Sequence, residues 1–173
     1  SEPTLFFSEF AEGTNYNNRY LEIFNPTDSD ISLDDYAFPT VGNSPTNQGN
    51  YEFWNSFTSG ATIPSKGFYI ISHPEADSSI LSKANQSFSY FTNGDDGLKL
   101  VKKIEGATNW GQPGTVGSSW PYSHNPNIAV EGTDFEVIDT LGDWQGDPGD
   151  GWNVAGISEA TKDHTLVRKS SVK

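Results

Sequence analysis

The chain has 173 residues, with 23 acidic and 10 basic side chains, and therefore a formal net charge of −13 at pH 7. This length is sufficient for one domain with a real hydrophobic core, and the excess of negative charge disfavours nucleic acid as a partner because phosphate backbones are repelled. Cysteine is absent, which excludes disulfides, thiolate metal sites and cysteine nucleophiles. No apolar run approaches the roughly 18 residues that a membrane-spanning helix requires.

Short runs rich in aromatic and β-branched residues alternate with clusters of Gly, Asn, Asp, Ser and Pro, which is typical of an all-β chain. The runs that predict strands are, in chain order, residues 5–10, 19–25, 31–38, 67–72, 97–103, 135–142 and 164–169. In the second run, the alternation predicts that Leu21 and Ile23 share one face and that Tyr20, Glu22 and Phe24 share the other. Residues 74–84 predict a helix of no more than a turn or two, with Asp77 or Ser78 as its N-cap. Many short strands at roughly regular spacing favour a sandwich or a barrel.

Two long polar segments interrupt this pattern, at about 39–60 and at about 105–133. Both are rich in Gly, Asn, Ser and Thr, and both carry aromatic residues. Structureless segments of such length inside a compact domain are uncommon and often functional. We therefore expect the individual function of the chain to lie in these two insertions.

The remaining sequence resembles a known family. The opening LFFSEFAEGTNYNNRYLEIFNPTDSDISLDDYAF, the middle segments GATIPSKGFYIIS and FTNGDDGLKLVKK, and the closing VIDTLGDWQGDPGDGW followed by ATKDHTLVRK are similar to the lamin tail domain in its bacterial, secreted form. The resemblance implies an immunoglobulin-like β-sandwich, here a single domain spanning 1–173 with the two insertions. It also implies a non-catalytic accessory module of an extracellular bacterial protein, because such relatives look like appendages of secreted hydrolases, nucleases, phosphatases and surface proteins.

No residue pattern predicts an enzyme. The sequence has no nucleophile elbow, zincin motif, phosphate-binding loop or dinucleotide fingerprint. His73, His124 and His164 lie in three separate segments, and we expect His164 to hydrogen-bond the neighbouring backbone. Glu9 and Glu22 could lie on adjacent strands, where two carboxylates about 5–9 Å apart can cleave glycosides. Both belong to the family-like opening, however, so a structural role is expected for them.

Calcium is the one metal that the composition favours, because loops rich in Asp, Asn and Gly supply its six to eight oxygen ligands. The stretch DWQGDPGDGW offers Asp143, Asp147 and Asp150 as candidate ligands of a structural calcium ion. A second acidic cluster, NGDDG at 93–97, is equally well explained as a hairpin turn. No cofactor is required by either pattern.

Aromatic side chains in the insertions predict carbohydrate binding, since aromatic rings stack on sugar faces while nearby polar groups bond the hydroxyls. The candidate contact residues are Trp110, Trp120, Tyr122, His124 and Asn125 from the second insertion, Trp54 from the first, and Trp144. The alternative is that the tryptophans plug their own loops as local cores.

The resulting hypothesis is a secreted, non-catalytic module that binds polysaccharide, with catalytic or anchoring domains of the same parent chain as further partners. The alternatives are a spacer or attachment domain without a ligand and an accessory domain of a secreted nuclease or phosphatase. Exposed tryptophans beside a groove would indicate a binding module, whereas fully packed tryptophans would indicate a spacer.

Overall fold

The computed structural model describes residues 4–14, 17–42, 51–91, 94–110, 129–142, 144 and 146–171. Within this part of the chain, all regular structure is strand except one four-residue helix, so the predicted all-β fold class is confirmed. The residues form two compact units, each assembled from separate stretches of chain. The first unit comprises Ser1–Ser32, Thr62–Asp95 and Pro148–Lys173, and the second comprises Leu33–Ala61 and Asp96–Asp147. No helix in the described part of the chain has the length and apolar character that crossing a membrane requires.

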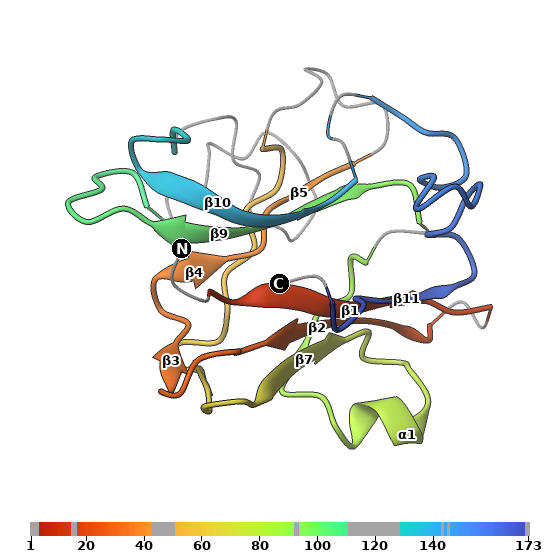
Figure 1. Cartoon of the computed structure of the whole chain (residues 1–173), viewed down its shortest axis with the longest axis horizontal. Coiled ribbons are helices and arrows are strands. Elements are labelled where there is room, and N and C mark those ends of the chain that lie inside the picture. Colours follow the sequence, from red (N-terminus) through yellow and green to blue (C-terminus); the bar gives the residue numbers. More distant parts are fainter. Residues whose placement is uncertain are drawn as a thin grey trace. The chain divides into compact units, whose positions relative to one another are not determined.

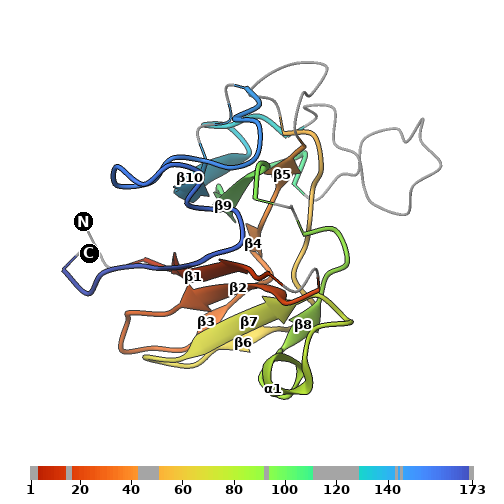
Figure 2. The ribbon, with the colours of Figure 1, turned by 90° about the vertical axis from the view of Figure 1, so that its right-hand side faces the viewer.

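The first unit is built on a five-stranded sheet. Its strands lie in the order β11 (Thr165–Val167), β1 (Phe6–Glu12), β2 (Arg19–Phe24), β7 (Phe68–Ser72) and β8 (Gln86–Ser87). All neighbours are antiparallel except β7 and β8. The short helix α1 (Ser78–Leu81) lies in the connection between β7 and β8, as Figure 2 shows. A separate pair is formed by β3 (Ile31–Ser32) and β6 (Thr62–Ile63).

The period-two pattern of β2 decides which face of this sheet is buried. Leu21 and Ile23 are fully buried, whereas Tyr20, Glu22 and Phe24 are half-buried, so the predicted alternation is confirmed. Phe10 pairs with Leu21 in register, so the same face continues onto β1. A register shift between Phe7 and Glu9 leaves the residue between them unpaired in a β-bulge.

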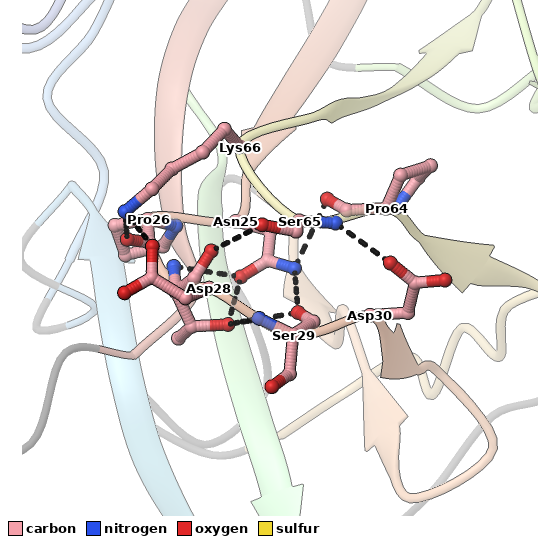
Figure 3. A network of polar contacts seen from close by, with 9 residues as sticks. Asn25, Pro26, Asp28, Ser29, Asp30, Pro64, Ser65 and Lys66 are labelled. Carbon is pink, nitrogen blue, oxygen red and sulfur yellow. Dashed lines mark hydrogen bonds and ion pairs between the residues drawn. The ribbon is translucent and has the colours of Figure 1, made fainter.

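A buried asparagine holds the turn that follows β2 (Figure 3). The Asn25 side chain is fully buried, and its Nδ2 donates hydrogen bonds to the carbonyl oxygens of Ser29, Ile63 and Pro64 at 2.8, 3.0 and 3.1 Å. Its Oδ1 accepts from the Thr27 backbone N–H at 3.0 Å. Because both ends of the amide are used, this side chain joins the turn to the chain that enters β7.

Lys66 makes the outer contacts of the same network: its Nζ forms an ion pair with Asp28 Oδ1 at 3.0 Å and donates a hydrogen bond to the carbonyl oxygen of Pro26 at 2.6 Å.

Gly94, which belongs to the first unit and to the predicted turn 93–97, occupies a position that favours glycine. Gly94 has a φ of +107°, and a Cβ there would lie 2.8 Å from the carbonyl oxygen of Thr161. Nearby, Glu12 and Arg19 form a buried ion pair at 3.3 Å, and the Glu12 carboxylate also accepts from the backbone N–H of Asp163. His164 Nδ1 bonds the carbonyl oxygen of Lys162, so the prediction that this histidine serves its own turn is confirmed.

The second unit is built on β9 (Gly97–Lys103), which pairs with β10 (Phe135–Leu141) along one edge and with β4 (Tyr36–Ala37) and β5 (Thr40–Val41) along the other. Figure 1 labels these strands, and in Figure 2 β10 and β5 lie on opposite sides of β9. All of these pairs are antiparallel. Leu98 and Leu100 bury one face of β9, while Gly97, Lys99 and Val101 line the other. The second face meets a cluster of buried residues: Ala37, Val41, Tyr51, Trp54, Val101, Ala129, Phe135 and Trp144.

Candidate ligand-binding site

The two insertions meet at their bases in the second unit. Of the first, 39–42 and 51–60 are described, and of the second, 105–110 and 129–133. The Trp54 ring packs edge to face against the Trp110 ring, with centroids 5.1 Å apart and an interplanar angle of 89°. The Tyr51 hydroxyl donates to Glu131 Oε2 at 2.6 Å. Two segments far apart in the sequence are thus joined by one aromatic and one polar contact.

A buried carboxylate fixes both ends of the second insertion. Asp134 is 1% exposed and accepts hydrogen bonds from the backbone N–H groups of Val130, Thr108 and Asn109 at 2.9, 3.2 and 3.3 Å. These donors, the Val130 N–H foremost, hold the pKa of the Asp134 carboxyl below its usual range. Asp134 therefore ties together the two described ends of the second insertion, 105–110 and 129–133.

A lysine lies against the aromatic cluster. Lys99 Nζ is 4.6 Å from the Trp144 ring centroid and 4.8 Å from that of Tyr51, and it donates to the Tyr51 hydroxyl at 3.1 Å. Burial lowers the pKa of Lys99, an effect that the Glu131 carboxylate partly opposes. Burial and the bond to Glu131 together raise the pKa of Tyr51. The Lys99–Tyr51–Glu131 chain thus links β9 to both insertions.

The positions of the predicted contact residues revise part of the binding hypothesis. Trp54 and Trp144 are only 4% and 2% exposed, because their rings form the core cluster of the second unit. In this structure they therefore offer no ring face to a ligand. Trp110 is partly buried and packs against the cluster. The other predicted contacts, Trp120, Tyr122, His124 and Asn125, lie outside the described residues.

Comparison with protein-family models, with curated proteins and with solved structures finds no match for this chain. The likeness to the lamin tail domain therefore depends on the sequence motifs alone.

The calcium prediction is only partly addressed by the structure. Asp150 forms an ion pair with Lys162 at 2.8 Å, Asp147 is exposed, and Asp143 lies outside the described residues. Among the residues described, no three or more His, Asp or Glu side chains are grouped so that they could hold a metal ion. Asp95 of the second acidic cluster is buried in its turn.

Glu9 and Glu22 are direct cross-strand neighbours on β1 and β2. Glu9 Oε2 accepts from the Tyr20 hydroxyl at 2.9 Å, and Glu22 Oε1 accepts from the Ser8 hydroxyl at 2.6 Å. Burial, with the Glu9 carboxylate next, raises the pKa of Tyr20 to about 12. The pair therefore lies on a sheet face of the first unit, where each carboxylate accepts a hydrogen bond from one neighbouring hydroxyl.

Sequence analysis missed Lys99, Glu131 and Asp134. Lys99 alternates with Leu98 and Leu100 and is expected to face solvent by periodicity alone. Only the aromatic residues that pack over that face, from other parts of the chain, turn it into a half-buried position. Asp134 directly precedes β10 and has no local sequence signal that distinguishes it from a turn aspartate.

Proposed function

We propose that this chain is a non-catalytic carbohydrate-binding module of a secreted bacterial protein, with a lamin-tail-like, immunoglobulin-like fold. The observation that carries the proposal is the junction of the two insertions through the Trp54–Trp110 and Tyr51–Glu131 contacts. Long loops that are merely tolerated have no need of a shared aromatic base, whereas a binding surface made from two loops requires that their bases be fixed relative to each other.

The chemistry of this base suits an uncharged polysaccharide. Trp110 is partly exposed and can stack on a sugar ring, and Glu131 is exposed and can accept hydrogen bonds from sugar hydroxyls. Trp120, Tyr122, His124 and Asn125 remain the predicted contacts within the insertion. A net charge of −13 repels polyanionic glycans, so neutral polysaccharides are the expected class.

A glycan array followed by affinity electrophoresis tests the proposal. Native gels that contain soluble neutral polysaccharides should retard the wild type, and Trp110→Ala and Trp120→Ala should each restore mobility. Trp152→Ala is the matched control, because Trp152 is a half-buried tryptophan in the first unit. Circular dichroism confirms that each variant is folded. If no polysaccharide retards the folded wild type, carbohydrate binding is refuted.

The second candidate is a spacer or attachment domain without a ligand. It is favoured by one observation, the burial of Trp54 and Trp144 in the core cluster. A spacer predicts no retardation in any gel and Trp110→Ala effects that are confined to stability. An extracellular location and catalytic or anchoring domains in the same parent chain belong to both candidates, and both derive from the family resemblance.

A further inference from the structure

The first unit carries a partly exposed sheet face that the proposed carbohydrate site does not use. It lies on the side of the sheet opposite to Leu21 and Ile23. Two cross-strand rows make up this face, which we name the aromatic–acidic face. One row is Phe6, Phe24 and Phe68, and the other is Val167, Glu9, Glu22 and Ile70.

Large apolar side chains are exposed on this face. Phe68 is 50% exposed and Val167 is 62% exposed. Phe24 contacts Phe68 at a centroid distance of 4.9 Å and Phe6 at 5.5 Å, so the three rings form one continuous ladder. Contiguous exposed apolar side chains mark an interaction surface more readily than isolated ones do.

Next to the rings, two carboxylates face each other. Glu9 and Glu22 are in register on adjacent strands, a placement that destabilises a sheet when both are charged. Burial raises the pKa of Glu22, the Glu9 carboxylate adds to the rise, and the Ser8 bond and Lys83 oppose it. A positively charged group that approached this face would relieve the repulsion between the two carboxylates.

The opposite end of the ladder shows how a cation can bind here. The Arg168 guanidinium carbon lies 5.1 Å from the Phe6 ring centroid, and its Nε donates to the carbonyl oxygen of Phe7 at 2.9 Å. At the other end, no cation from the described part of the chain lies over the Phe68 ring. Phe68 is the diagonal cross-strand neighbour of Glu22, about 7–8 Å away along the sheet. A cation within the roughly 6 Å range of the Phe68 ring is therefore also within reach of Glu22.

We propose that the aromatic–acidic face docks a basic peptide segment of a partner protein. One arginine or lysine of that segment lies over Phe68 and pairs with Glu22 and Glu9, while neighbouring apolar side chains of the segment cover Ile70 and Val167. Charge complementarity selects this occupant, because the net charge of −13 steers basic partners toward the chain. A second copy of the chain would place the Glu9–Glu22 pairs against each other, and an anionic surface would be repelled.

Fluorescence anisotropy with a labelled peptide of alternating arginine and leucine tests the proposal at physiological salt. Glu9→Gln/Glu22→Gln should weaken binding of this peptide about threefold or more, and Phe68→Ala should weaken it about two- to fivefold. The matched controls are Glu105→Gln/Glu136→Gln, which removes the same charge from exposed positions of the second unit, and Ile157→Ala, which removes an equally exposed apolar side chain. Both controls should bind like the wild type.

The proposal is overturned if the control pair loses as much affinity as the Glu9/Glu22 pair, since net charge alone then explains binding. It is also overturned if Phe68→Ala binds the peptide normally, or if Phe68→Ala instead abolishes retardation by a neutral polysaccharide. Glu22→Gln alone provides the folding check, because replacing a carboxylate that is unfavourably placed should keep or raise the unfolding midpoint. The variants of the face itself, at Glu9, Glu22 and Phe68, lie in the first unit and outside both insertions, so the two proposals fail independently.

Discussion

Replacement of Gly97 by alanine tests the packing beneath the joined insertions. Gly97 begins β9, and a Cβ at this position would lie 2.6 Å from Trp144 Nε1 and 2.7 Å from its Cδ1. The indole cannot easily move away, because Trp144 is 2% exposed and its ring packs against that of Tyr51 at 4.9 Å. Overpacking of this kind costs about 1–3 kcal/mol. In a chain of this size that corresponds to a fall in the unfolding midpoint on the order of 2–12 °C.

Thermal unfolding monitored by circular dichroism measures the effect. Gly42→Ala is the matched control in the same unit, because among the described residues its new Cβ would meet Glu52 Oε2 at 3.5 Å and a Phe53 carbon at 3.8 Å, which are ordinary contact distances. Its midpoint should stay within about 2 °C of the wild type. In a Trp144→Ala background the penalty of Gly97→Ala should disappear, since the clashing ring is gone. If Gly97→Ala melts with the wild type, the described packing of Trp144 is wrong.

Three further predictions concern the anchored carboxylate, the buried amide and the metal. The pKa of the Asp134 carboxyl is lowered in the folded protein, so its contribution to folding stability is complete above the unfolded pKa of about 4 and is lost as the pH falls through the folded-state pKa. The free energy of unfolding should therefore fall less steeply with acidification for Asp134→Asn than for the wild type. Equal slopes would contradict the anchoring role. Asn25→Asp should destabilise the fold more than Asn25→Ala, because it places a carboxylate against three carbonyl oxygens. Alanine only leaves these oxygens without a donor, which costs about 1–3 kcal/mol for each buried group. Urea unfolding compares the two variants, and the reverse order would refute the assigned amide orientation. If Asp143, Asp147 and Asp150 hold structural calcium, EDTA should lower the unfolding midpoint and added calcium should restore it; an unchanged midpoint removes the site.

Strand positions could be predicted wherever the strand is long enough to show a period. The run 97–103 coincides with β9, and the alternation of 19–25 gives the correct buried face of β2. The run 31–38 is instead divided into β3 and β4, because the Tyr36 N–H bonds the carbonyl oxygen of Leu33 in a tight turn. The two-residue strands β5, β6 and β8 were not predicted, since two residues carry no periodicity and their pairing is decided by tertiary contacts.

The burial of the candidate contact residues could not be predicted from the sequence. Sequence analysis selected Trp54 and Trp144 as contact residues because both are tryptophans in polar segments. Their burial depends on distant partners, as with Trp144, which fills the space above Gly97 and has a φ of +61°. Such a backbone conformation is uncommon for a bulky residue and has no local sequence signal here. The joining of the two insertions likewise depends on side-chain contacts that no spacing rule predicts.

Quantitative affinity electrophoresis of Trp110→Ala beside Trp152→Ala, with a neutral polysaccharide that retards the wild type, tests whether the joined insertions form the carbohydrate site. Trp110 connects the second insertion to Trp54 at the base of the first and is partly exposed. Trp110→Ala should bind this polysaccharide about two- to tenfold more weakly than the wild type does, whereas Trp152→Ala should bind it like the wild type. Equal binding by the wild type and both variants would contradict the claim that the joined insertions form the carbohydrate site.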